Sequence, residues 1–380
     1  MATVTGARTT GNVLVNQLAI DLGSDIRLLE PDVQILTTFT RETSKEAAVN
    51  PEFGWLEDEH KARFDTTTAS ATSGALLISV ANPDFFQQWD QLLVTRTGEQ
   101  LSVEAVEATS IKVARAVGST AAAINSGDEL MLIGTAQPEN DTSKAARSKT
   151  PSRVTNYTQI FRNPVEMSES LEATNFVVNP SEWPRMVARA GAEHAKDKEY
   201  AFLFGRKAKA TPGSTEQRRT GGALSFMTAN QTDAGGDLSE AEWNAFMGTV
   251  MRYGSSDKLA MAGTVGVSAL NKFPASKLMT RMDESTYGVS ISQYMSPYGH
   301  VNLVYHKLME GQKYGGYIMV VDIKQTRYRP LAGGGISRDT RFVPNIQPPD
   351  QDGKKGEFKA EAGLSFGLAR MHGVVSGVTS

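Results

Sequence analysis

Glu193-His194-Ala195-Lys196-Asp197-Lys198-Glu199-Tyr200-Ala201-Phe202-Leu203-Phe204-Gly205 is the second half of the longest helical pattern in this chain. It continues a pattern that starts near Pro180, with Ser181 as the expected N-cap and Gly205 as the expected stop. The apolar positions recur at about i, i+4, i+7 spacing, at Trp183, Val187, Ala190, His194, Ala201 and Phe204. The pattern predicts a helix of about 24 residues, about 36 Å long, which is unusual for a globular domain.

A second helix is predicted from Ser239 onward. Ser239 and Glu242 have capping-box spacing, and Leu238 and Trp243 have the spacing of a hydrophobic staple across that cap. One helical face is apolar, and we expect it to be core rather than a ligand surface. Gly254 is expected to close the helix. The apolar face comprises Trp243, Phe246, Met247, Val250 and Met251.

Residues from about 70 to 136 predict strands. Short apolar runs recur there at roughly 8–12-residue spacing with glycine turns between them, which is typical of a small antiparallel barrel or sandwich. The flanks are polar and are expected to be loops, at Asp65–Thr68 before the module and Glu139–Lys144 after it. The runs themselves are 75–80, 92–95, 101–106, 111–117 and 130–133.

The two ends of the chain are less regular. Residues 1 to about 60 carry short apolar patches on a polar, Thr-rich segment, which fits either an arm lying across another surface or an irregular subdomain. Beyond Gly254, strands and helices are mixed, with a short helix at 267–273 and a flexible loop at 332–335. The strands expected there are 259–262, 289–292, 301–305, 317–321, 328–331, 341–343, 358–366 and 373–378.

The amino-acid composition excludes several classes of protein and several kinds of site. The chain has 380 residues, which suggests two or three domains, and 39 basic against 42 acidic residues, which argues against a strongly basic nucleic-acid binder or a polybasic membrane anchor. It has no cysteine, which excludes disulfides, thiolate metal sites and a cysteine nucleophile. No signal peptide and no apolar run near 20 residues is evident. The 34 glycines suggest many turns or close backbone contacts.

A search for reactive constellations finds no Walker A, G-x-G-x-x-G, H-E-x-x-H or G-x-S-x-G motif. His194 lies between Glu193 and Asp197, but we favour a satisfied helix histidine over a metal ligand. The run beginning at Asp350 has a carboxylate at position 12, Glu361, yet it fits a turn better than a calcium loop. We therefore expect no catalytic residue, no metal site and no cofactor.

Basic residues gather in two places. Complementary contact with a neighbouring subunit, or loose contact with packaged nucleic acid, is one interpretation, and solvated loop charges are the other. For any single residue we favour the second. The groups are Lys144, Arg147, Lys149 and Arg153, and then Arg206, Lys207, Lys209, Arg218 and Arg219, while Glu57, Asp58 and Glu59 are acidic.

The order of several segments along nearly the whole chain resembles the tailed-phage major capsid proteins with the Hong Kong ninety-seven-like fold. No single motif is specific to this family, and the resemblance rests on the order of the motifs along the chain. The segments are 52–58 (EFGWLED), 156–161 (NYTQIF), 165–168 (VEMS), 193–205, 220–224 (TGGAL), 287–289 (YGV), 294–299 (YMSPYG) and 372–375 (HGVV).

The resemblance implies an α+β capsid fold divided into interleaved parts. Residues 1–52 would be an N-terminal arm, and 53–165 an extended E-loop that carries the β module of about 70–136 as a barrel-like insertion. Residues 166–254 and 326–380 would form the P-domain with its long spine helix, and 255–325 the A-domain. Gly6, Gly11, Gly54 and Gly333–Gly335 would provide hinges.

The resemblance also implies a function and partners. The chain would be a structural protein that assembles into hexamers and pentamers of an icosahedral shell around double-stranded DNA, in the virion after assembly in the bacterial cytoplasm. Its partners would be copies of itself, a portal, a decoration protein and DNA held by non-specific contact, without a membrane. Because the arm starts almost at Met1, scaffolding would come from a separate protein. We expect no lysine–asparagine crosslink.

Two alternatives remain at this point. A tail or decoration protein of a phage would also be structural, although a 24-residue helix argues against a mostly-β tail protein. A hydrolytic enzyme on a mixed α/β scaffold would need paired carboxylates in a cleft, and the sequence cannot place such a pair.

Overall fold

The computed structural model describes residues 35–43, 45–60, 62–140, 142, 150–174, 182–212, 215–273, 278–280 and 292–379. The described chain falls into two compact units, and each is described by itself below. The larger unit comprises residues 1–55 and 153–380, and the smaller comprises 56–152. Several residues named above lie outside the described ranges, namely Gly6, Gly11, Lys144, Arg147, Lys149, Ser181 and 287–291.

The smaller unit is a six-stranded antiparallel barrel. Neighbours along the sheet run β2-β7-β4-β5-β6-β3, and a bridge between Thr67 and Val80 closes β2 onto β3. Its core is apolar and includes the fully buried Ile78, Leu92 and Leu101. Turn spacing predicted either a small antiparallel barrel or a sandwich, and the structure has the barrel. The strands are β2 (Phe64–Thr66), β3 (Leu77–Ser79), β4 (Asp90–Val94), β5 (Gln100–Val106), β6 (Ser110–Ala114) and β7 (Glu129–Thr135), with a 3-10 turn η3 (Pro83–Phe85).

The expectation of a loop at Asp65–Thr68 is wrong, since β2 occupies Phe64–Thr66 and pairs with β7. In this short strand the apolar side chain faces solvent and the charged side chain faces the interior, the reverse of the usual pattern. Phe64 faces outward, whereas Asp65 points inward and accepts hydrogen bonds from the backbone N–H and side-chain amide of Asn82, both at 2.9 Å.

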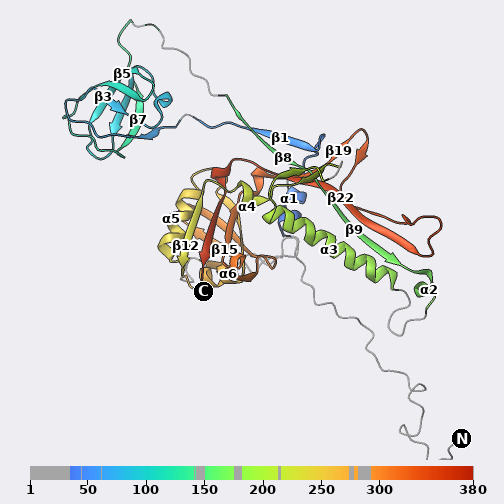
Figure 1. Ribbon diagram of the computed structural model, residues 1–380. Coiled ribbons are helices and arrows are strands. Elements are labelled where there is room, and N and C mark those ends of the chain that lie inside the picture. Colours follow the sequence, from blue (N-terminus) through green and yellow to red (C-terminus); the bar gives the residue numbers. More distant parts are fainter. Residues whose placement is uncertain are drawn as a thin grey trace, which may run out of the picture. The chain divides into compact units, whose positions relative to one another are not determined.

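The larger unit is built on a long helix, α3 (Trp183–Phe204), which packs along β9 (Gln159–Met167) and β22 (Lys354–Phe366) (Figure 1). The predicted long helix is confirmed at 22 residues. Gly205 is its C-cap, and only glycine fits there, because a Cβ would lie 2.3 Å from the Ala201 carbonyl oxygen. Strand β22 pairs with β9, β18 (Thr326–Pro330) and β21 (Arg341–Val343), all antiparallel.

The predicted buried face of α3 is partly wrong. Ala201 and Phe204 are only half-buried, while Lys198 and Glu199 are buried beside Phe202. The hydropathy pattern predicted the wrong residues for this face because two charged residues, Lys198 and Glu199, lie on the buried side of the helix. The buried residues are Ala190, His194, Ala195, Lys198, Glu199, Phe202 and Leu203.

A seven-stranded mixed sheet forms the rest of the larger unit, in the order β12-β23-β17-β13-β16-β15-β14. Helix α5 (Glu240–Val250) packs its Trp243 and Phe246 into the core around this sheet. The strands are β12 (Gln231–Gly236), β13 (Asp257–Ala262), β14 (Leu278–Thr280), β15 (Ser292–Ser296), β16 (Gly299–Tyr305), β17 (Ile318–Val321) and β23 (Gly373–Val378). The short helices nearby are α6 (Thr264–Asn271), α7 (Gly311–Tyr314), η4 (Ile323–Gln325) and η5 (Ala369–Met371).

The capping box at the start of α5 is confirmed, with the Ser239 hydroxyl accepting from the Glu242 backbone and the Glu242 carboxylate accepting from the Ser239 backbone. The expected stop at Gly254 is wrong, because the helix ends at Val250 with Met251 as its C-cap. Gly254 lies in the following turn with a φ of +82°, a conformation that favours glycine.

Small elements complete the larger unit. The loop expected at 332–335 is a tight hairpin of β19 (Ala332–Gly333) and β20 (Ile336–Ser337), whose turn has positive φ at Gly334 and Gly335. A helix that the sequence did not predict, α1 (Ile35–Thr43), places Leu36 in the core against α3. The others are β1 (Glu52–Glu57) paired with β8 (Ser152–Tyr157), β10 (Ala208–Ala210) paired with β11 (Gln217–Arg219), α2 (Glu169–Glu172) and α4 (Ala223–Phe226).

Candidate functional site

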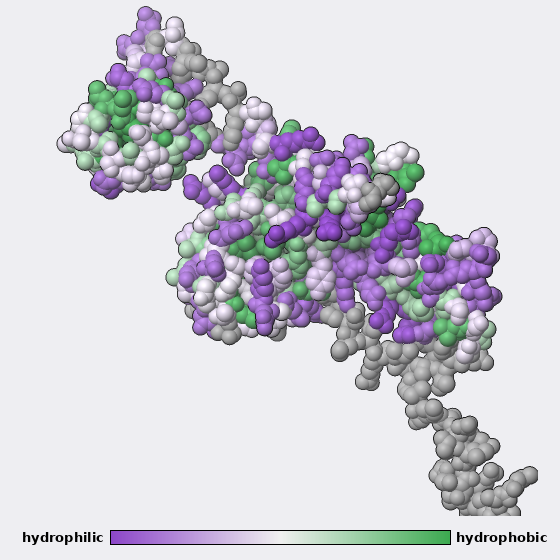
Figure 2. Space-filling model, viewed as in Figure 1, coloured by the Kyte–Doolittle hydropathy of each residue, from purple (hydrophilic) through white to green (hydrophobic). Residues whose placement is uncertain are grey.

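Among the described residues, no group of three or more His, Asp or Glu side chains is arranged to hold a metal ion. No helix in the described part of the chain is long and apolar enough to span a membrane. On the face shown in Figure 2, hydrophilic and hydrophobic residues are interspersed over the larger unit. The search for function therefore turns to hollows, buried polar groups and surface charge.

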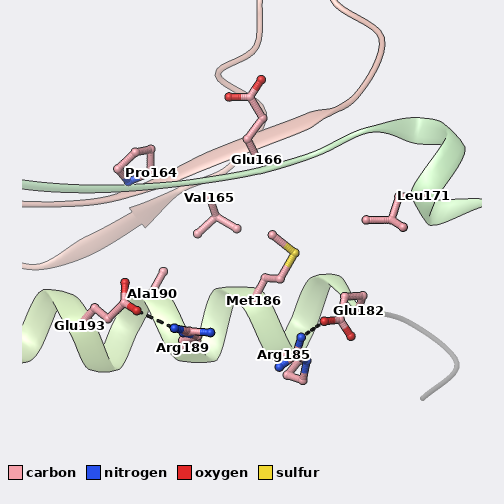
Figure 3. A pocket seen from close by; sticks show the side chains of 10 residues that line it. All are labelled: Pro164, Val165, Glu166, Leu171, Glu182, Arg185, Met186, Arg189, Ala190 and Glu193. Atoms are coloured by element: carbon pink, nitrogen blue, oxygen red, sulfur yellow. Dashed lines mark hydrogen bonds and ion pairs between the residues drawn. The ribbon is translucent and has the colours of Figure 1, made fainter. Parts of the chain in front are cut away.

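One hollow of about 420 Å³ lies between α3 and the segment of β9 and α2. Val165 points from the strand toward the helix, and Met186 points from the helix toward the strand (Figure 3). The lining carboxylates are ion-paired, Glu182 with Arg185, Glu193 with Arg189 and Glu166 with Lys355. No two of these carboxylates are left free to act as the acid and base of a hydrolase.

His194 is a buried helix histidine, but the satisfied ring that the sequence favoured is only half right, because Nε2 has no hydrogen-bond partner among the described residues. Its Nδ1 lies 2.7 Å from Oδ1 of Asn163, whose amide Nδ2 in turn donates to Asp197 at 2.7 Å. The amide oxygen can only accept, so Nδ1–H donates. Burial lowers the pKa of His194 to about 4, which leaves the ring neutral at pH 7.

The calcium interpretation of residues 350–361 fails on geometry. Glu361 lies well inside β22, so extended backbone separates it from Asp350. At about 3.3 Å per residue the strand cannot fold back into a 12-residue loop. Glu361 is buried instead between two arginines, with Arg218 at 3.1 Å and Arg338 at 2.6 Å from its carboxylate.

A buried carboxylate connects three separate segments of the larger unit. Glu199 of α3 accepts hydrogen bonds from the backbone N–H groups of Leu36 at 2.6 Å and Thr37 at 2.9 Å, and from the Thr37 hydroxyl. These two N–H groups lie in the first turn of α1, where a helix has no internal acceptors for them. Nε2–H of His306 donates to the same carboxylate at 2.9 Å, because Nδ1 accepts from the Leu308 backbone. Glu199 therefore fixes α1 onto α3 and the end of β16.

Lys258 has a comparable role at the end of α5. Its ammonium donates to three carbonyl oxygens, those of Val250 at 2.9 Å, Tyr253 at 2.8 Å and Met371 at 2.5 Å. All three of its N–H groups are therefore used, and the last turn of α5 is capped. Burial lowers its pKa to about 8.

His372 is a second neutral histidine in the larger unit. Its Nδ1 accepts from the Asp322 backbone at 3.0 Å, so Nε2–H donates to the Gly367 carbonyl oxygen at 2.9 Å. Burial lowers its pKa to about 4. Lys258 and His372 are both buried and neither lines the hollow between α3 and β9, so their hydrogen bonds to backbone groups indicate structural roles.

The structure brings part of the two basic groups together. Lys207, which precedes β10, contacts the Thr155 hydroxyl of β8 and lies 5.0 Å from the Tyr157 ring. Arg153 is also on β8. Two of the basic residues are ion-paired, Lys209 with Glu216 and Arg218 with Glu361. Within the described residues, Arg206 and Arg219 have no ion pair.

Sequence reasoning missed Glu199, Glu361 and Lys258. The signal available for Glu199 was its place beside the apolar run Tyr200–Phe204 in the middle of a helix. A lone charge next to such a run gives no indication of its partners, because Leu36 and His306 are distant in the chain.

Comparisons with known proteins agree with one another. The family model described as SU10 major capsid protein matches residues 3–379. A curated relative, the major capsid protein of Pseudomonas phage PaMx41, is 24% identical over 282 residues, which is 70% of this chain and 67% of that protein.

Two solved structures are similar in fold. The capsid of an empty GTA particle computed with C5 symmetry has a TM-score of 0.53 at 10% identity, with 98% of each chain covered. The structure from Mycobacterium phage Bobi has a TM-score of 0.50 at 12% identity, covering 98% of this chain and 99% of that one.

Proposed function

The chain belongs to the SU10 major capsid protein family, and on that premise we propose that it builds the head of a tailed phage as hexamers and pentamers of an icosahedral shell. The family match over residues 3–379 carries this proposal, and the Hong Kong ninety-seven-like fold agrees with it. A major capsid protein is a structural part of the virion. The family thus decides against both the hydrolase and the tail or decoration protein considered from the sequence.

The parts of the chain receive roles under this proposal. Residues 1–52 are the N-terminal arm, 53–165 the E-loop with its inserted barrel, 166–254 and 326–380 the P-domain, and 255–325 the A-domain. The long α3 supports the assignment of a spine helix. Strands β12 and β23 fall within the P-domain ranges, yet they belong to the seven-stranded sheet, where β23 pairs with β17 of the A-domain range. Under this proposal the sheet therefore contains strands of both domains.

Subunit contacts supply the strength of the shell. The chain has no cysteine, so no disulfide reinforces it. The near balance of 39 basic and 42 acidic residues permits charge pairing between neighbours, whereas a large net charge would make the copies repel one another. The basic surface with Arg206 and Arg219 is suited to a complementary neighbour or to loose contact with packaged DNA.

Assembly involves other proteins under this proposal. A separate scaffolding protein directs the shell in the bacterial cytoplasm, a portal occupies one vertex and a decoration protein binds outside. No lysine–asparagine crosslink forms.

The test is direct assembly. We would express the full chain alone and with the scaffolding candidate encoded beside it, and examine both samples by sedimentation and negative-stain microscopy. Uniform shells or hexamer rings are the expected result. A chain that stays monomeric in both samples, and with every structural protein of its phage present, contradicts the proposal.

A further inference from the structure

The barrel of the smaller unit has a region without charged side chains. Residues 66–83 contain no Asp, Glu, Lys, Arg or His, and neither do residues 116–127. Charged residues make up 21% of the chain, so two such segments of this length would ordinarily carry several charges. The two segments can form one uncharged surface only if they lie close together in the structure.

The two uncharged segments lie side by side. Ala71 and Ile124 exchange backbone hydrogen bonds at 2.8 and 2.9 Å. The Gly127 backbone donates to the Thr67 carbonyl oxygen at 2.8 Å, and the Ser126 hydroxyl donates to that of Thr68 at 3.0 Å. The segments therefore form one continuous surface at one end of the barrel, which we call the neutral face and define as residues 68–77 and 117–126.

A buried ion pair fixes the backbone conformation of the two loops that form the neutral face. The Arg115 guanidinium, bound to Glu99 at 2.7 Å, also donates to the carbonyl oxygens of Thr72, Ala75 and Ala122. Glu99 accepts from the Ala122 backbone at 3.0 Å. Both loops are thus fixed before any partner arrives, which lowers the entropy lost on binding.

The exposed side chains of the neutral face are apolar or hydroxylic, apart from the amide of Asn125. Leu76 and Leu77 are 53% and 52% exposed, and Val117 is 38% exposed. Figure 2 shows a hydrophobic area on the visible side of the smaller unit. The charges that border the face are already paired, Arg96 with Asp128 and Lys112 with Glu104. The other exposed residues of the face are Thr68, Ala69, Ser70, Thr72, Ser73, Gly74, Gly118, Thr120, Ala123, Asn125 and Ser126.

We propose that the neutral face is an isologous contact between the barrels of two copies of this chain in the shell. In an isologous contact the same patch meets itself, so any charge near the axis faces its own like charge. The neutral face avoids this conflict. Its hydroxyls can also pair with their own copies, because a Ser or Thr side chain both donates and accepts. A surface that binds an oppositely charged partner would instead carry charged side chains.

The contact rests on the proposed function, since only a shell brings the barrels together at high local concentration. We therefore expect the contact in assembled shells and not between free subunits.

Single cysteines test the contact, because the chain has none of its own. Ser70→Cys, Ser73→Cys and Leu77→Cys are introduced one at a time, with Thr109→Cys, an exposed residue of the β5–β6 turn, as the matched control. Assembled shells are oxidised mildly and run on a non-reducing gel. We expect a covalent dimer from at least one position of the neutral face, because a residue near the axis meets its own copy within disulfide range. Intact shells that yield no more dimer than the control overturn the contact and leave the proposed function standing.

A charge-insertion pair gives the second measurement. Leu76→Glu with Leu77→Glu places like charges across the axis, whereas Val106→Glu adds a charge at a 38% exposed position between Glu104 and Glu107. Thermal unfolding of free subunits checks that both variants fold. Shells of the double variant should dissociate at a lower denaturant concentration than Val106→Glu shells. Equal dissociation of the two overturns the proposal.

Discussion

Glu199 and His306 lie 107 residues apart in sequence, and Oε1 of the one is 2.9 Å from Nε2 of the other in the core of the larger unit. The same carboxylate holds the first turn of α1 through the backbone of Leu36 and Thr37. One side chain therefore fixes α1, a helix within the proposed arm of residues 1–52, to the rest of the larger unit.

Glu199→Gln should loosen α1. The amide that replaces one carboxylate oxygen is a donor, so at least one of the four donor groups around it loses its acceptor, at about 1–3 kcal/mol for each buried group. Hydrogen exchange of residues 35–43 should accelerate more than tenfold. Glu193→Gln, on the exposed side of the same helix, serves as the control and should leave that exchange unchanged.

Acid should destabilise the larger unit through its neutral histidines. The pKa of His372 is about 4 in the fold against 6.5 for a free histidine, because burial disfavours the charged ring. The unfolded chain therefore binds the extra proton first. The contribution of His372 to the free energy of unfolding is fully present above about pH 6.5. It is lost as the pH falls toward 4, by at most about 3 kcal/mol.

The measurement is the unfolding midpoint in denaturant between pH 7 and pH 4. His372→Gln should flatten the profile, and removal of the exposed His60 by His60→Gln should not. A profile that is flat in the unmodified chain would contradict the assignment of neutral, buried rings.

Gly222→Ala should be strongly destabilising. A Cβ at this position would lie 2.6 Å from the Ala201 carbonyl oxygen and 2.8 Å from that of Phe202, both backbone atoms at the end of α3. Neither atom can move without disturbing the helix, so we expect a loss of about 2 kcal/mol or more. Gly248→Ala on α5 is the comparison, since its Cβ would meet only the Tyr298 ring at 3.5 Å, and it should be neutral or stabilising by about 0.5–1 kcal/mol. Thermal unfolding of both variants distinguishes the two outcomes.

Glu99→Gln should destabilise the smaller unit alone. It leaves the buried Arg115 without its carboxylate, and breaking such a pair costs about 3–5 kcal/mol. Hydrogen exchange should rise across residues 64–135 and stay unchanged in α3 and α5. Glu104→Gln, which removes an exposed partner of Lys112, should have an effect below about 1 kcal/mol. If exchange rises throughout the larger unit as well, the two units are not independent.

Deletion of residues 2–30 should abolish shell assembly and leave the fold intact. The core around α1 starts at Ile35, so this deletion removes none of its buried residues described here. Circular dichroism and thermal unfolding report on the fold, and sedimentation reports on assembly. A deletion variant that unfolds would show that the removed segment is part of the core instead of an arm.

The sequence was informative where a signal is local. The capping box of Ser239 and the turn spacing of the barrel are each contained in a few residues, and both led to elements that the structure has. The resemblance led to the family through the order of such segments.

Structure that depends on distant partners could not be predicted. Helix α1 has few local signals, because its first turn is satisfied by Glu199 rather than by a neighbouring cap. The outward Phe64 and inward Asp65 of β2 follow from Asn82, which lies 17 residues away. The buried Lys198 and Glu199 made part of the expected face of α3 wrong for the same reason.

The position of β23 in the seven-stranded sheet has a consequence for biosynthesis. This strand lies between β12 and β17 and pairs with both, and it is parallel to β12, whose Gln231 faces Val374. During translation at roughly 5–20 residues per second, β12 waits on the order of ten seconds for that neighbour. The sheet cannot close until the ribosome has synthesised the chain through Val378. A nascent chain therefore lacks the complete seven-stranded sheet until its β23 segment has left the ribosome.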